Sequence, residues 1–183
     1  MEKIFWKSSV DSTLIWAKEE AKKSVGKELD RALFVADEQT AGKGRLGRVW
    51  TSVPGENIYM TLLLMRPEVR IENASSLTLV MGLSVAEAVE GVVGVTAGIK
   101  WPNDIVLSGK KICGILTEMQ IKEQKPEFIM IGVGINVNQT FCILIFKMNS
   151  FCTYHFCTDK TCSLFLAKQT KWQVCYPCHR RQY

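Results

Sequence analysis

The chain contains 183 residues, of which 47% are hydrophobic and 22% charged, and its formal net charge at pH 7 is +5. This length suits one domain, with or without an appendage. The longest uninterrupted apolar runs, such as residues 141–146, are too short to span a bilayer. Residues 1–7 lack the apolar core of a secretory signal. We therefore expect a cytoplasmic protein without a membrane segment.

The composition changes near residue 141. Residues 1–141 contain equal numbers of basic and acidic side chains, so the positive excess lies in residues 142–183, together with most of the cysteines and both histidines. We predict a folded domain over residues 1–140 and a separate cysteine-rich tail over residues 141–183. Cys175, Cys178 and His179 have the spacing of a c-type haem attachment site or zinc knuckle. The abrupt change is more typical of out-of-frame or aberrantly spliced sequence.

The start of the chain predicts a strand, a helix and a second strand. Residues 1–6 are apolar enough for an edge strand. Ser12 and Thr13 precede an apolar stretch, so a helix is expected from there to about Ser24, with either hydroxyl capping its free N–H groups. The same hydroxyls could instead face a ligand. Residues 32–36 form a compact apolar run that predicts a buried strand.

That strand leads directly into a loop in which glycines alternate with cations. Glycine lets the backbone turn through positive φ and approach a ligand closely. The arginine fork matches carboxylate and phosphate groups, and successive backbone N–H groups can bind an anion. The loop therefore predicts a receptor for a small anionic ligand, and a basic surface loop is the alternative that this run alone leaves open. Its residues include Gln39, Gly42, Lys43, Gly44, Arg45, Gly47, Arg48 and Trp50.

A second strand and a second helix follow the loop. Residues 57–65 are strongly apolar and predict a strand that Pro67 stops. Residues 72–90 place apolar side chains at intervals of three and four, which predicts a helix with one apolar face. We expect its Met and Leu side chains to belong to the core.

The last elements of the predicted domain are strands. Residues 99–107 and 110–118 flank a Ser-Gly pair and predict a β-hairpin. Pro102 interrupts the first run and marks a strand break or bulge. Residues 128–138 predict a final strand. The pattern favours an α+β fold, with a mixed β-sheet and helices mainly on one face.

Four motifs together resemble the catalytic domain of biotin protein ligases. They are GKGRLGRVW at 42–50, KWPND at 100–104, KICG at 111–114 and GVGIN at 132–136. The resemblance covers roughly residues 4–140. It implies an ATP-dependent, AMP-forming enzyme that activates biotin with ATP and Mg²⁺ to biotinyl-5′-adenylate. The biotinyl group would then pass to a lysine of a biotin carboxyl carrier domain. Two alternatives remain, a lipoate-ligase-like adenylating enzyme and a catalytically impaired binder of biotin or biotinyl-adenylate.

The resemblance implies a role for each motif residue, in a reaction that needs cations and backbone dipoles around two anions. The catalytic residues would be Arg45 and Lys111, at the biotin carboxylate and α-phosphate, and Asp104, near the triphosphate and the incoming lysine. Biotin or its adenylate would contact Ser12, Thr13, Gln39, Gly42, Lys43, Gly44, Arg45, Lys111 and Gly114. The nucleotide would contact Arg48, Trp50, Lys100, Asn103, Asp104, Gly132, Gly134 and Asn136.

The chain also departs from the family pattern. Leu14 stands where relatives often carry asparagine. No helix-turn-helix is expected before the first strand, so DNA is not an expected partner. Residues 141–183 do not match the C-terminal SH3-like domain of relatives, which we expect to be absent. The resemblance implies no metal site built from protein ligands alone, and it allows a homodimer.

Overall fold

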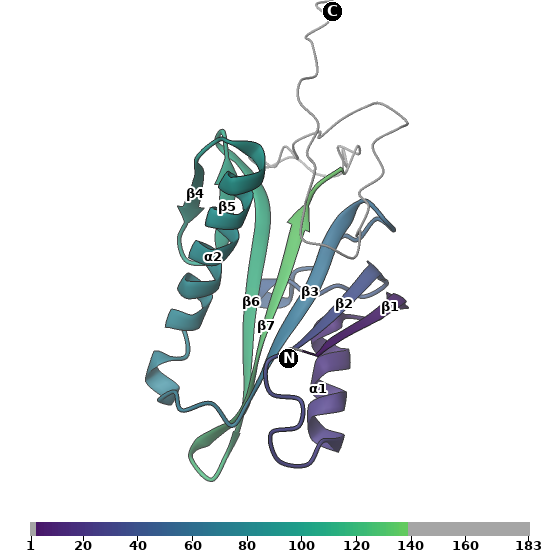
Figure 1. Ribbon diagram of the computed structural model, residues 1–183, viewed down its shortest axis with the longest axis vertical. Coiled ribbons are helices and arrows are strands. Elements are labelled where there is room, and N and C mark those ends of the chain that lie inside the picture. Colours follow the sequence, from purple (N-terminus) through teal and green to yellow (C-terminus); the bar gives the residue numbers. More distant parts are fainter. Residues whose placement is uncertain (1–2, 139–183) are drawn as a thin grey trace, which may run out of the picture.

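The computed structural model describes residues 3–138, which form a seven-stranded sheet with two α-helices (Figure 1). The predicted tail, residues 141–183, lies outside the described residues. The elements in chain order are β1 (Ile4–Val10), α1 (Thr13–Lys23), β2 (Ala32–Gln39), β3 (Asn57–Met65), α2 (Ser76–Val93), β4 (Ala97–Lys100), β5 (Asp104–Leu107), β6 (Lys110–Lys122) and β7 (Lys125–Asn136), with single 3₁₀ turns at Arg45–Gly47 and Ile71–Asn73.

The sheet is mixed, and its strand order is β1-β2-β3-β7-β6-β5-β4. β1 and β2 run parallel, because α1 carries the chain back between them, and all other neighbouring strands are antiparallel. The predicted α+β class and mixed sheet are therefore confirmed. The predicted edge strand is also present as β1, with Ile4 and Trp6 largely exposed.

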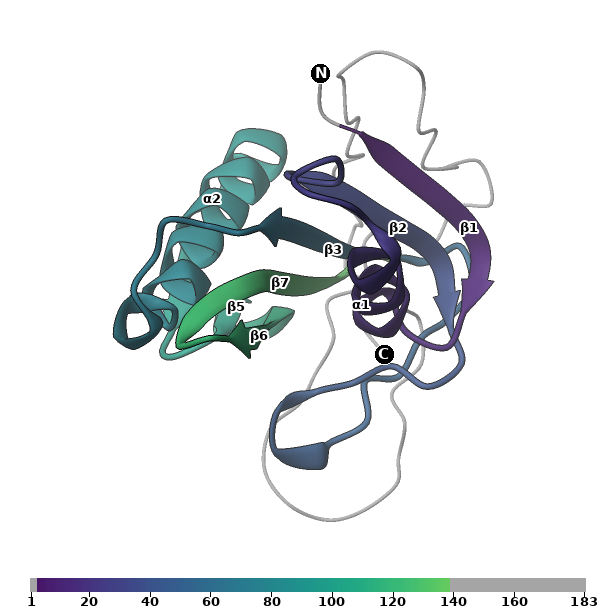
Figure 2. The ribbon, with the colours of Figure 1, turned by 90° about the horizontal axis from the view of Figure 1, so that it is seen from below.

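The two helices pack on opposite faces of this sheet. Leu63 of β3, paired with Met130 of β7, belongs to the apolar cluster around α1, whereas the adjacent pair, Leu62 and Ile131, packs with the cluster around α2. Successive side chains of a strand point to opposite faces. The expectation of helices mainly on one face is therefore wrong. In Figures 1 and 2, α2 lies beside β5 and β6, while α1 lies toward the β1–β3 part of the sheet.

α1 is anchored by aromatic packing. Its buried Trp16 contacts Phe34 of β2 edge-on, with ring centroids 5.0 Å apart. Phe5 of β1 stacks on the same Phe34 ring at 5.1 Å. The observed helix agrees with the predicted one, and its basic residues, Lys22 and Lys23, lie in the last turn, where cations favour the helix dipole.

α2 starts later than expected, after a 3₁₀ turn at Ile71–Asn73, and ends at Gly94 with φ 67°. Within residues 3–138, only one side of it is covered. Gly82 lies close to Ile105 and Ile115 of the sheet, while the outer residues Leu79, Val80 and Leu83 are exposed. By length and composition the stretch Ile71–Val93 could also cross a membrane. In this fold its inner face forms part of the core.

The predicted hairpin is present, in a more divided form. β5 and β6 are joined by Ser108 and Gly109, with φ values of 49° and 77°, the pattern of a type I′ turn. The first predicted run breaks at Pro102, as expected, and forms two short strands, β4 and β5, that pair with each other. The turn at Pro102, between β4 and β5, places Asn103 and Asp104 at one end of the sheet.

Candidate active site

A pocket lies on the α1 side of the sheet, where α1, the loop between β2 and β3, β6 and β7 meet. Its volume of about 60 Å³ is well below the roughly 300–1,000 Å³ of typical small-molecule sites. A ligand of nucleotide size therefore fits only after the loop moves. The lining residues are Ser12, Thr13, Leu14, Gln39, Lys43, Gly44, Arg45, Trp50, Asn103, Lys111, Gly114, Ile115, Leu116, Gly132, Val133 and Gly134.

Hydroxyl and amide groups at the start of α1 form the inner end of the pocket. Ser12 has the extended backbone of an N-cap residue but makes no capping hydrogen bond. Its buried hydroxyl lacks a partner among residues 3–138. The N–H of Thr13 donates instead to Gln39 Oε1 at 2.9 Å. The predicted capping role of Ser12 and Thr13 is therefore wrong, because a side chain from β2 replaces the local cap and leaves the Ser12 hydroxyl facing the pocket.

The floor of the pocket is a pair of glycines covered by Trp50. Gly114 of β6 and Gly134 of β7 are cross-strand partners. A Cβ atom at Gly114 would stand 2.7 Å from the Trp50 ring, and one at Gly134 would stand 2.6 Å from it. Only glycine at these two positions allows the indole to lie on the sheet. The indole Nε1 is buried without a hydrogen-bond partner in the described part of the chain.

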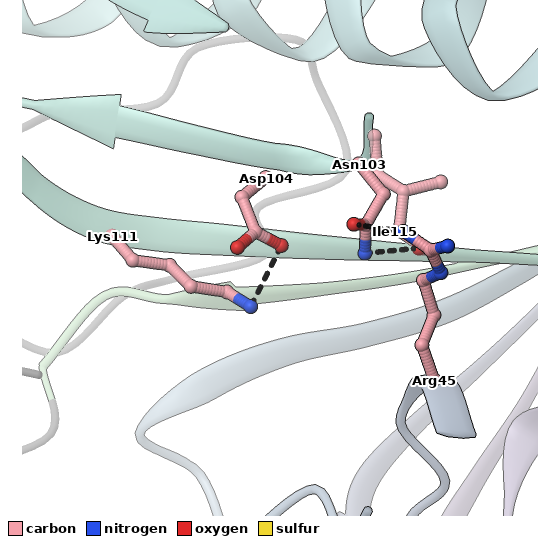
Figure 3. Close-up of polar contacts among 5 residues, drawn as sticks. All are labelled: Arg45, Asn103, Asp104, Lys111 and Ile115. Atoms are coloured by element: carbon pink, nitrogen blue, oxygen red, sulfur yellow. Dashed lines mark hydrogen bonds and ion pairs between the residues drawn. The ribbon is translucent and has the colours of Figure 1, made fainter. Parts of the chain in front are cut away.

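The basic loop is held mainly by its own backbone. Trp50 N donates to Gly42 O at 2.9 Å, and Gly44 N donates to Arg48 O at 2.8 Å. Leu46, at the tip, has φ 56° and an exposed side chain. Outside the loop, Arg45 Nη1 donates to Asn103 Oδ1 at 2.9 Å (Figure 3). A few contacts therefore attach a basic, largely exposed loop over the pocket.

The opposite wall carries an ion pair. Lys111 Nζ lies 2.7 Å from Asp104 Oδ1, with side-chain exposures of 23% and 19% (Figure 3). Lys111 Nζ also lies 5.5 Å from the centroid of the Trp50 ring. Asn103 Nδ2 donates to Ile115 O at 3.0 Å, which leaves its oxygen oriented to accept from Arg45. The partly buried cation of Lys111 thus faces the pocket beside the loop cations.

A buried thiol lies next to this pair. Cys113 of β6 is fully buried, and its pKa is raised from 9.0 to about 12, chiefly because burial disfavours the thiolate, with Lys111 acting in the opposite direction. A thiol in this state is not a nucleophile near neutral pH. Cys113 therefore serves the core rather than the chemistry of the pocket.

The structure brings most of the predicted site residues together. Of the others, Gly42 supports the loop through its bond to Trp50, and Asp104 pairs with Lys111. Arg48 and Lys100 are exposed and do not line the pocket, and Asn136 pairs with Asn57 at the end of β7. The pocket also has apolar lining that sequence reasoning missed, namely Leu14, Ile115, Leu116 and Val133. The apolar patterns of their strands and helix predicted only that these four residues belong to the hydrophobic core.

Among residues 3–138 no cluster of three His, Cys, Asp or Glu side chains occurs. Mg²⁺ usually retains water and binds through one or two carboxylates plus substrate phosphates. The Asp104 carboxylate beside the pocket fits that weaker requirement.

Comparison with known proteins places the chain in a family. The model of the Biotin/lipoate A/B protein ligase family matches residues 11–136. The bifunctional ligase/repressor BirA of Bacillus spizizenii is 50% identical over 107 residues, which cover 58% of this chain and 33% of that protein. The biotin–[acetyl-CoA-carboxylase] ligase of Mycobacterium tuberculosis is 34% identical over 122 residues, or 65% of this chain and 44% of that protein.

A solved structure shares the fold. The biotin protein ligase from Aquifex aeolicus in complex with biotin and ATP matches with a TM-score of 0.62 and 38% identity, over 77% of this chain and 55% of that one. The chain thus spans between a third and about half of these proteins. Because the family model covers most of the chain, and the four motifs fall within it, this protein belongs to the biotin/lipoate A/B protein ligase family.

Proposed function

We propose that this chain is the catalytic part of a biotin–protein ligase, which activates biotin with ATP and transfers the biotinyl group to a lysine of a carrier protein. The observation that carries the proposal is the combination of three cations, Lys43, Arg45 and Lys111, with a polar inner end formed by Ser12 and Gln39, all lining one pocket. Similarity to ligases that bind biotin and ATP supports it.

In the first half-reaction a carboxylate oxygen of biotin attacks the α-phosphorus of ATP. The bond from that phosphorus to the bridging oxygen breaks, and pyrophosphate leaves. Two anions must come together, so the main requirement is positive charge that is already in place. Lys111, held by Asp104, and Arg45, held by Asn103, would provide it. Mg²⁺, when bound, would neutralise charge on the departing phosphates, with Asp104 as its protein contact.

In the second half-reaction the lysine amine of the carrier attacks the acyl carbon of the adenylate. The bond to the phosphate oxygen breaks, AMP leaves with the electron pair, and the amine loses a proton to solvent. The mixed anhydride hydrolyses in water, so it must be covered. The loop that carries Trp50 over the glycine floor is suited to cover it.

The inner end of the pocket favours biotin over lipoate. A cyclic urea has two N–H donors and a carbonyl acceptor, which match the unpartnered hydroxyl of Ser12 and the amide of Gln39. The dithiolane ring of lipoate has neither group and would leave the buried hydroxyl without a partner, at a cost of about 1–3 kcal/mol. The lipoate-ligase alternative is therefore less well supported.

Radiolabelled ATP provides the test. We expect the purified chain to release pyrophosphate and form biotinyl-5′-AMP when biotin is added, and to form far less adenylate with lipoate. Added carrier domain should then become biotinylated, as detected by a shift in its mass. Biotin binding without adenylate would support the impaired-binder alternative instead. Absence of biotin binding would contradict the proposal as a whole.

The carrier, the cellular compartment and the assembly belong to the same proposal. A name such as biotin–[acetyl-CoA-carboxylase] ligase, carried by a relative, supports a biotin carboxyl carrier domain as the acceptor. We also propose a cytoplasmic location, and we keep the homodimer as a prediction.

A further inference from the structure

A chain of buried hydrogen bonds runs from the middle of the sheet to the pocket. Thr61 of β3 is fully buried, and its hydroxyl donates to Thr13 Oγ1 at 2.9 Å. Thr13 Oγ1 donates to Gln39 Oε1 at 3.2 Å, and the backbone N–H of Thr13 donates to the same oxygen at 2.9 Å. Thr61 itself does not line the pocket, and no family motif identified in the sequence includes it.

The direction of these bonds determines which end of the Gln39 amide faces the ligand. A backbone N–H can only donate, so the atom facing Thr13 must be the amide oxygen. The amide nitrogen then lies on the side of the loop, 3.4 Å from where a Cβ at Gly42 would stand. Reversal of the amide would place its N–H groups against the N–H of Thr13 and leave buried donors unpaired, which is costly.

Thr61 maintains this orientation. By donating to Thr13 Oγ1, it occupies an acceptor site of that hydroxyl and leaves the hydroxyl proton directed at Gln39. We infer that Thr61 is a positioning residue, which acts through Thr13 to hold the Gln39 amide as a hydrogen-bond donor toward an acceptor group of the ligand. The inference rests on the proposed function, in which that acceptor is the carbonyl oxygen of a cyclic urea.

The first test is Thr61→Val, which keeps the shape of the side chain and removes its hydroxyl. We expect the Kd for biotin, measured by calorimetry, to rise about 2- to 10-fold, the value of one buried hydrogen bond. The Kd for ATP should stay unchanged. Thr61→Ser retains the hydroxyl and should restore biotin binding. The matched control is Thr78→Val, which breaks a similar 2.8 Å contact between Thr78 and Thr117 on the α2 side of the sheet.

Two further variants test the path through Gln39 independently. Gln39→Glu keeps an oxygen for both Thr13 donors but removes the amide donor, so biotin binding should weaken at least about 10-fold, since an acceptor then faces an acceptor. In a Gln39→Ala background, Thr61→Val should add less than about 2-fold, because residues of one network are not additive. Gln39→Glu, which leaves Thr61 in place, remains informative if Thr61→Val does not fold.

The outcomes separate this inference from the proposed function. Biotin binding by the unsubstituted chain, with unchanged affinity in Thr61→Val or in Gln39→Glu, would overturn the inference alone. An equal loss in Thr61→Val and Thr78→Val, or equal losses for biotin and ATP, would show a general structural effect and also overturn it. Absence of biotin binding by the unsubstituted chain would overturn the proposed function, and the inference with it.

Discussion

The ion pair between Lys111 and Asp104 is the charged contact closest to the proposed chemistry. Its distance is 2.7 Å, and both side chains are largely but not fully buried. The pair holds a cation at the wall of the pocket before any substrate arrives, which is the property that electrostatic catalysis requires. Because the pair retains contact with water, its importance is in positioning charge rather than in stabilising the fold.

Replacement of the Lys111 side chain should slow adenylate formation far more than replacement of another lysine on the same strand. For Lys111→Ala we expect adenylate formation, measured as biotin-dependent pyrophosphate release, to fall about 10²- to 10³-fold, as when one oxyanion donor is lost. Arg45→Ala should behave similarly. Lys122→Ala, an exposed residue of β6, is the matched control and should keep the full rate. Full activity in Lys111→Ala would contradict the assignment.

Cys113 gives a prediction about pH. Its pKa of about 12 in the folded chain lies above the ordinary 9.0, so the folded state keeps a proton that the unfolded state loses between these pH values. Its contribution to stability is therefore present below pH 9 and is lost as the pH rises toward 12. At pH 8, iodoacetamide should label the Cys113 peptide slowly, and rapidly after denaturation, as mapped by mass spectrometry. Rapid labelling of the folded chain would contradict this burial.

At the scale of elements, the basic loop is the part that must move. Residues 42–50 bury little besides the Trp50 ring, and Leu46 and Val49 are 88% and 81% exposed. The backbone bonds Trp50–Gly42 and Gly44–Arg48 hold a conformation in which the pocket is narrow. The loop therefore has to rearrange for a ligand to enter, and it can close afterwards over the adenylate.

Limited proteolysis tests this movement. Trypsin should cut the free chain at Lys43, Arg45 or Arg48, and saturating biotin with ATP should slow these cuts, because an ordered loop fits a protease poorly. Cleavage after Lys27, in the segment between α1 and β2, provides an internal control that should not change. Equal rates at the loop with and without ligands would leave it as a basic surface loop.

At the scale of the whole molecule, the sheet is covered on both faces and its central strands are paired on both sides. The two apolar clusters, one beneath each helix, consist of residues between positions 3 and 138. All strand pairings of the sheet lie in the same range. We therefore expect this part of the chain to provide most of the stability.

Removal of residues 140–183 tests that expectation. The truncated chain should keep its melting temperature within about 4 °C, equivalent to roughly 1 kcal/mol for a domain of this size. It should also keep its affinity for biotin. Circular dichroism melts of both chains give the comparison. A much larger drop would show that the removed segment packs on the domain, for example against exposed side chains such as Trp6 and Val80.

The sequence by itself determined the elements and the family. Apolar periodicity located both helices and most strands, because local side-chain patterns reflect which face is buried. The order of four motifs identified the ligase family, and the motif residues Arg45, Lys111 and Gly134 all line the pocket. The glycines at positions 114 and 134 indicated where another group approaches the sheet, because a side chain at either position would collide with the Trp50 ring.

Only the tertiary structure decided how these parts face one another. The apolar runs of β3 and β7 are compatible with burial on one face or on both, so they could not show that α1 and α2 lie on opposite sides. Local pattern favoured a cap by Ser12, yet the Thr13 N–H is accepted by Gln39, which lies 26 positions from Thr13. The role inferred for Thr61 depends likewise on a contact across 48 positions. Such contacts arise from strand order and packing, which no local pattern specifies.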